Sequence, residues 1–238
     1  MAANIGEIRL GVSARIQDDD GKLSITPDLL CEVDRAILSA LEQYSKDRPL
    51  EKAVRIAGTA TFKYAVSGLT GFIDGFSSVL GIAYPHLAAD QQLAFLEDDE
   101  FLLQRDDSGL FLWFTQARPA ASEFFLAAFT APHTLNASTS TIPVSDDQAV
   151  MDLGAAFACD QLAALYAKDI DSSISADAVD RRTKSDNYRS MAASLRKSYA
   201  AKMQTGESGR AAGTLAEIDR GFGNMVGTDY FFHGKRRF

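Results

Sequence analysis

The sequence has few of the features that point to a membrane, a disulfide framework or a metal site. No stretch reaches the roughly 18 consecutive apolar residues of a membrane-spanning helix. The opening residues MAANIGEIRL lack the basic start and apolar core of a signal peptide, so we expect synthesis in a cytoplasm. The two cysteines, Cys31 and Cys159, lie among apolar residues and away from any Cys or His at metal-ligand spacing. Buried thiols are therefore the expectation for both.

Motifs for catalysis are also missing. The sequence contains no nucleophile elbow, phosphate-binding loop, dinucleotide fingerprint or zinc motif. The histidines His86, His133 and His233 are scattered, and no Ser, Cys or carboxylate stands at a recognisable spacing from them. The acidic runs at 18–20 and 98–99 are more typical of solvated turns than of calcium loops or acid/base pairs. The sequence thus predicts a protein that is not an enzyme and binds neither cofactor nor metal.

The net charge of -8 is unevenly distributed along the chain. Residues 1–180 carry 12 Lys and Arg against 27 Asp and Glu, a net charge of -15, whereas residues 181–238 carry 12 against 5, a net charge of +7. A basic C-terminal quarter on an acidic body indicates that this end contacts something negative. Nucleic acid and an acidic patch on a neighbouring subunit both fit.

Residues 1–50 read as the first helices of a helical core. The length of 238 residues suits one large domain or two small ones, and the composition, 46% hydrophobic, is that of a globular protein. Apolar residues at steps of three and four predict a helix over 5–16. Thr26 and Pro27 form a helix start signal, and the apolar stripe that follows runs to Ser45 before Pro49.

Residues 51–144 have the sequence pattern of β-strands. Short runs rich in aromatic and β-branched residues are separated by Gly, Pro and paired Asp, and the sequence DDSG between FLLQR and LFLWF is a hairpin signal. This segment predicts an inserted antiparallel β domain.

Helical character returns over 145–205 and completes the core. Ser145 and Gln148 have the spacing of a capping box, and the helix that follows, to about Lys168, is apolar nearly all round, which predicts a buried central helix. A second long helix has Asp177 as its expected cap and carries an apolar stripe at Tyr188, Ala192, Leu195, Tyr199 and Met203. The fold class is therefore α+β: an antiparallel helical bundle interrupted by the β domain and followed by an extended C-terminal arm over 206–238.

Two segments are candidate binding surfaces. Basic residues on the last long helix form either a solvated face or a surface that lines a DNA channel or meets an acidic neighbouring subunit: Arg181, Arg182, Lys184, Arg189, Arg196 and Lys197. The arm has no periodicity and cannot build a core alone, yet it is rich in residue types that dominate interfaces. Its candidate docking residues are Phe222, Tyr230, Phe231, Phe232, Arg236, Arg237 and Phe238.

The order of segments resembles that of the head-tail connector adaptor (head completion) proteins of tailed bacteriophages. The likeness covers about residues 5–204 and rests on these stretches: IGEIRLGVSARI, LSITPDLLCEVDRAILSALEQYSKDRP, GFSSVLGIAYP, FTAPHTLNASTSTIPVSDDQAV and DSSISADAVDRRTKSDNYRSMAASLRKSYAAKM. The arm at 206–238 does not match the family residue by residue.

The resemblance implies a structural virion protein at the neck, made in the cytoplasm of a host bacterium. Such subunits form a ring, commonly of twelve copies, that docks on the portal protein after genome packaging. The ring retains the genome until ejection and is the platform for the tail or the next neck protein. Contact with genomic DNA in the channel would be non-specific, and no membrane is involved. In relatives a C-terminal extension reaches the portal, a role that falls here to 206–238.

Three other interpretations remain open at this stage. A tail-completion or stopper protein would sit further down the neck. A soluble nucleic-acid-binding module would use residues 181–202 and bind DNA as a monomer with a steep salt dependence, although the acidic body argues against it. An enzyme, such as a carbohydrate-active β domain, is supported only by the aromatic content of 51–144, which core packing explains equally well.

Overall fold

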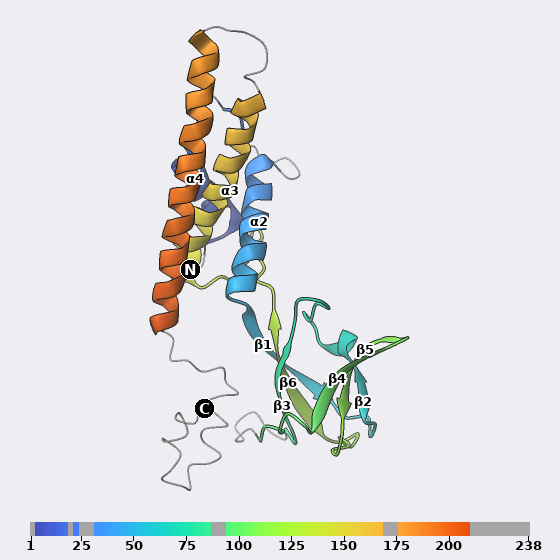
Figure 1. Cartoon of the computed structure of the whole chain (residues 1–238). Helices are drawn as coiled ribbons and strands as arrows, with labels where there is room; N and C mark the ends of the chain where they lie inside the picture. The colour runs from blue at the N-terminus through green and yellow to red at the C-terminus, as the bar shows by residue number, and fades with distance from the viewer. Residues whose placement is uncertain (1–2, 19–20, 24–30, 87–93, 169–175, 210–238) are drawn as a thin grey trace, which may run out of the picture. The chain divides into compact units, whose positions relative to one another are not determined.

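The computed structural model describes residues 3–18, 21–23, 31–86, 94–168 and 176–209, with the side chains of the last segment described over 184–203. The fold is mixed α+β, as predicted (Figure 1). The described chain divides into two compact units: a helical unit formed by the residues up to Pro49 together with His133–Gly209, and a β unit over Leu50–Pro132.

The helical unit is built around its third helix. α3 (Asp147–Lys168) packs against α1 (Ile5–Ile16), α2 (Glu32–Asp47) and α4 (Ala176–Gly209). α2 and α4 both run antiparallel to α3 (Figure 1). The prediction of a buried central helix is confirmed, because side chains along its whole length are buried, including the fully buried Ala155, Ala158, Cys159 and Leu162.

The apolar stripe predicted on the last long helix is also confirmed. Ala192 and Tyr199 are buried, and the other stripe residues pack against the same core: Tyr188, Leu195 and Met203. The helix continues to Gly209, past the predicted start of the arm at 206. Residues 210–238 lie outside the described part of the chain.

The starts of α2, α3 and α4 differ from the sequence-based expectations. α1 begins with a capping box between Asn4 and Glu7. The predicted capping box of Ser145 and Gln148 is wrong: Ser145 lies in a short 3-10 turn, η2 (Val144–Asp146), and its hydroxyl donates to Asp146 Oδ1 at 2.9 Å. Gln148 instead accepts a hydrogen bond from Arg15. α2 begins at Glu32 with Cys31 as its N-cap, so it does not begin at Thr26 and Pro27, which lie outside the described residues. α4 begins at Ala176, so Asp177 lies within the helix and is not its cap.

The β unit contains two three-stranded antiparallel sheets. The first has the order β1 (Leu50–Ala57), β6 (Phe124–Ala131), β3 (Val79–Ala83), and the second β2 (Lys63–Ala65), β5 (Gly109–Phe114), β4 (Phe101–Asp106). The hairpin predicted from DDSG is confirmed, with Asp106 paired to Gly109, whose φ of 133° suits glycine. A short 3-10 turn, η1 (Val66–Gly68), follows β2.

Aromatic rings fill the core of the β unit. Tyr64, Phe114 and Phe125 meet edge to face with ring centroids 4.8–5.5 Å apart, and Phe72 tilts against Phe129. Aromatic pairs favour these geometries. The aromatic content of this segment is thus in large part core packing.

Residues 133–144, which the sequence placed in the β segment, belong to the helical unit. The amide of His133 donates to Ser45 Oγ at 3.0 Å, and its Nε2 lies 3.0 Å from the carbonyl oxygen of Arg48. Leu135 and Ile142 are buried in the helical core. These bonds to residues far away in the sequence set the boundary at Pro132.

Within the described residues, no helix combines the length and apolar character needed to cross a bilayer.

Candidate functional site

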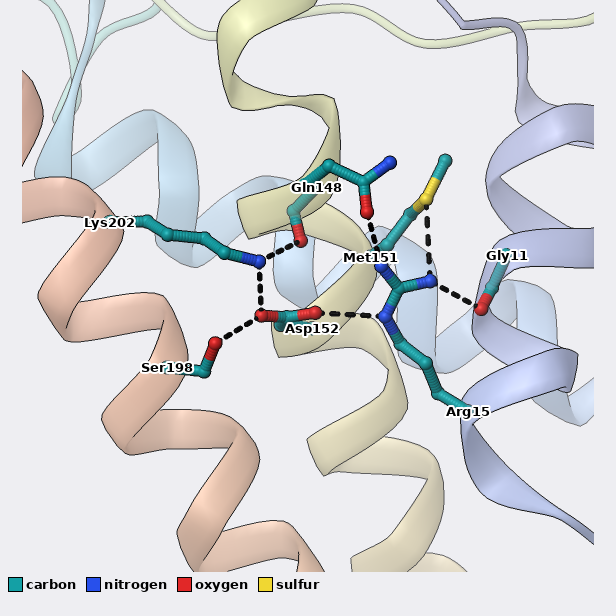
Figure 2. Close-up of polar contacts among 7 residues, drawn as sticks. All are labelled: Gly11, Arg15, Gln148, Met151, Asp152, Ser198 and Lys202. Atoms are coloured by element: carbon teal, nitrogen blue, oxygen red, sulfur yellow. Dashed lines mark hydrogen bonds and ion pairs between the residues drawn. The ribbon is translucent and has the colours of Figure 1, made fainter.

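A buried carboxylate joins three helices of the helical unit (Figure 2). Asp152 on α3 is 4% exposed. Its Oδ1 accepts a hydrogen bond from Arg15 Nε of α1 at 2.8 Å. Its Oδ2 accepts from Ser198 Oγ and from Lys202 Nζ of α4, each at 2.6 Å. We call these four residues the Asp152 cluster. A single side chain thereby holds α1 and α4 to opposite sides of its own helix.

Both cations of the Asp152 cluster are held by further contacts. Arg15 donates to the carbonyl oxygen of Gly11 at 2.7 Å and to Gln148 Oε1 at 2.5 Å, and its Nη1 lies 3.6 Å from Met151 Sδ. Lys202 Nζ lies 3.4 Å from the carbonyl oxygen of Gln148. Burial opposes the charged form of Asp152, but the hydrogen bonds from Lys202, Ser198 and Arg15 outweigh it and lower the pKa of this carboxyl.

A second buried ion pair lies at the end of α2. Asp146 Oδ2 accepts a hydrogen bond from Tyr44 Oη at 2.5 Å and pairs with Arg48. Burial opposes the charge on Asp146, yet the bonds from Tyr44, Arg48 and Ser145 lower its pKa. Burial, together with the carboxylate, raises the pKa of Tyr44. His133 also binds the carbonyl oxygen of Arg48. The residues around Asp146 therefore fix both the end of α2, after which the chain leaves the helical unit, and His133, where the chain returns to it.

The lowered pKa values of Asp152 and Asp146 predict loss of stability in acid. A carboxyl whose pKa is lower in the folded than in the unfolded chain, where it is about 3.9 for Asp, stabilises the fold above that value. The stabilisation is lost as the pH falls through the folded-state pKa. Asp147, whose pKa is raised by burial, opposes the trend.

We therefore expect the urea midpoint to fall as the pH is lowered from about 5 to about 3. The Asp152→Asn variant should show a shallower fall over the same range, since it lacks one of the buried carboxyls whose pKa is lowered. A midpoint for the unmodified chain that does not change with pH would contradict this assignment.

Two of the six residues of the predicted basic face of α4 have acidic partners on the same chain. Arg189 lies 3.5 Å from Asp186, and Arg196 pairs with Asp160 of α3. Lys184 Nζ lies 5.5 Å from the ring centroid of Tyr166. Lys197 is exposed and makes no ion pair among the described residues. Arg181 and Arg182 lie on the backbone of α4, but their side chains are outside the described part.

The predicted docking residues of the arm all lie outside the described residues: Phe222, Tyr230, Phe231, Phe232, Arg236, Arg237 and Phe238. Among the described residues, no group of three or more His, Cys, Asp or Glu side chains could hold a metal ion.

Sequence reasoning missed the Asp152 cluster, although it left one signal. Asp152 is one of three acidic residues, with Asp147 and Asp160, on a helix that is otherwise apolar nearly all round, and a buried carboxylate needs partners. This pattern could have predicted a buried ion pair on the helix, but it does not separate Asp152 from Asp160, whose side chain is 42% exposed. It could not have identified Arg15, Ser198 and Lys202, because these residues lie 137, 46 and 50 positions away.

No family model matches this chain, and neither the curated proteins nor the solved structures contain a match.

Proposed function

We propose that this chain is the adaptor subunit of a head-tail connector in a tailed bacteriophage. In this role it forms a ring, docks on the portal protein after packaging, retains the genome and presents the attachment platform for the tail or the next neck protein. The protein is a structural component of the virion neck, made in the host cytoplasm, with no catalytic function.

The observation that carries the proposal is where the resembling blocks lie in the fold. Most of the stretches that resemble the adaptor family belong to 5–48 and 145–204, which are separated by about a hundred residues of sequence. The described residues of both blocks lie in one helical unit, and Leu50–Pro132 between them forms a β unit of its own. This is the helical core with an inserted β part that the resemblance implies.

A connector must keep its shape while it retains the packaged genome, and buried ion pairs support this role. Breaking such a pair leaves an uncompensated buried charge, so α1, α3 and α4 are held in a defined register. Within the ring, the arm over 206–238 supplies the contact with the portal through its aromatic and Arg residues. Several copies binding together add avidity to this contact.

The same geometry makes the nucleic-acid-binding module the weaker alternative. Arg196 and Lys202 each pair with an Asp of α3 on their own chain. Their positive charge is therefore partly neutralised before any phosphate approaches. Contact with DNA in the channel is expected to be weak and independent of sequence.

Co-sedimentation with portal rings tests the proposal. The purified chain is mixed with portal rings of the same phage and separated on a sucrose gradient. We expect the chain to move with the rings at about one copy per portal subunit. A chain that stays at the top of the gradient at saturating concentration contradicts the proposal.

A further inference from the structure

The sheet β2-β5-β4 has a second apolar face that is exposed. One face carries Tyr64, Leu112 and Phe114, which are buried in the core of the β unit. On the other, Leu102 and Trp113 are direct cross-strand partners and are 51% and 41% exposed. We call this second face the outer sheet face. An exposed Trp beside an exposed Leu on an edge hairpin is unusual for a free surface and typical of a docking site.

Acidic residues lie at both ends of this apolar pair. Asp99 is exposed, and Glu100 precedes β4. Thr115, directly after β5, donates from its hydroxyl to the Asp99 carbonyl and from its amide to the Glu100 carbonyl, each at 2.9 Å. These bonds fix the backbone of Asp99 and Glu100 next to the end of β5. Asp107 is exposed at the hairpin turn. Lys63 of β2, the other cross-strand partner of Trp113, lies on this face as well, but it pairs with Asp106. Asp99 and Asp107 leave a net negative charge at the ends of the face, so its partner should be basic around a small apolar centre.

The outward side of α4 on the same chain has this chemistry. Arg189 and Lys197 are exposed, and between them lie the small exposed residues Ala193 and Ser194, which leave room for an indole ring. The pair Arg189–Asp186 is 63% exposed on both sides, so it is worth little and can exchange partners. This outer helix face is defined by Arg189, Ala193, Ser194 and Lys197.

We propose that the outer sheet face of one copy docks on the outer helix face of the next copy. Each subunit then uses two different surfaces, and a head-to-tail contact of this kind generates a closed ring if the rotation between copies closes. Leu102 and Trp113 of one copy pack between Arg189 and Lys197 of the next. Asp99 and Asp107 pair with Lys197 and Arg189 of that next copy. The inference deepens the proposed function, because it rests on ring formation and names the interface that builds the ring.

A mixing experiment with two variants tests this pairing. Leu102→Ser/Trp113→Ser disables the outer sheet face, and Arg189→Glu/Lys197→Glu disables the outer helix face. We expect the unmodified chain to form species larger than dimers with rising concentration in analytical ultracentrifugation. Each variant alone should associate at least about tenfold more weakly. An equimolar mixture should form heterodimers and stop there, because each variant keeps the face that the other lacks.

Leu10→Ser is the matched control. Leu10 on α1 is 69% exposed, more than Leu102, and it lies outside both faces. The control should associate like the unmodified chain, and circular dichroism should show that all variants are folded.

Three results would overturn the interface: no association of the unmodified chain at any concentration, unchanged association of either variant, or no heterodimers in the mixture. Co-sedimentation with the portal remains a separate readout. If the unmodified chain binds portal and both variants associate normally, the proposed interface is wrong. The proposed adaptor function is then unaffected.

Discussion

Replacing Asp152 with alanine is expected to lower the free energy of unfolding by about 3 kcal/mol. The carboxylate is buried and accepts hydrogen bonds from two cations and a hydroxyl on two other helices. Its removal leaves Arg15 and Lys202, whose side chains are 24% and 41% exposed, without the charge that balances them. Because water solvates both cations in part, the expected loss is at the lower end for a buried pair. The loss is also structural, because α1 and α4 lose their shared attachment to α3.

Asp160→Ala provides the matched control for this prediction. Asp160 also lies on α3 and also pairs with a base of α4, Arg196, but both side chains are more than 40% exposed. Exposed ion pairs contribute about 0–1 kcal/mol. Urea unfolding followed by circular dichroism measures both variants, with equal m-values required for the comparison. If Asp152→Ala and Asp160→Ala lower the free energy of unfolding equally, burial does not make the Asp152 cluster more stabilising than an exposed ion pair.

Deleting residues 206–238 is expected to abolish portal binding while the rest of the chain stays folded. The core-forming residues among the described part of both units lie before this segment, so the unfolding temperature should change little. Affinity for portal rings should fall by at least about 100-fold, since a few aromatic and Arg side chains supply most of the binding energy of an interface. Biolayer interferometry on immobilised portal rings measures the change.

Two further variants separate docking from simple charge attraction. The full chain with Tyr230, Phe231 and Phe232 replaced by serine should bind as poorly as the truncated chain. A chain with residues 222–238 in scrambled order keeps the charge and the aromatic content, and it should also fail. Binding by the scrambled chain at full strength would show that charge and composition suffice. Binding by the truncated chain would refute the role of the arm.

Local signals in the sequence predicted the elements that local physics controls. The hairpin at Asp106–Gly109 follows from turn residues between two apolar runs, and the bounds of α1 follow from its apolar spacing. The central position of α3 follows from its apolar residues on every side. The α+β class was predictable from the contrast between the helical and the strand-like segments of the sequence.

Features that depend on distant residues were not predictable in the same way. Ser145 has the spacing of a capping box, but its hydroxyl bonds Asp146, whose carboxylate is held by Tyr44 and Arg48 about a hundred positions away. The segment after Pro132 has the turn residues of a β connection, but His133 fixes it to the end of α2. In both places tertiary hydrogen bonds override the local pattern.

Electron cryo-microscopy of the full chain bound to portal rings is the decisive test of how the arm acts. We expect a ring of copies on the portal in which the aromatic rings of residues 222–238 are buried against portal subunits. A map in which these residues pack onto the subunit to which they belong, with no contact to the portal, would contradict this expectation.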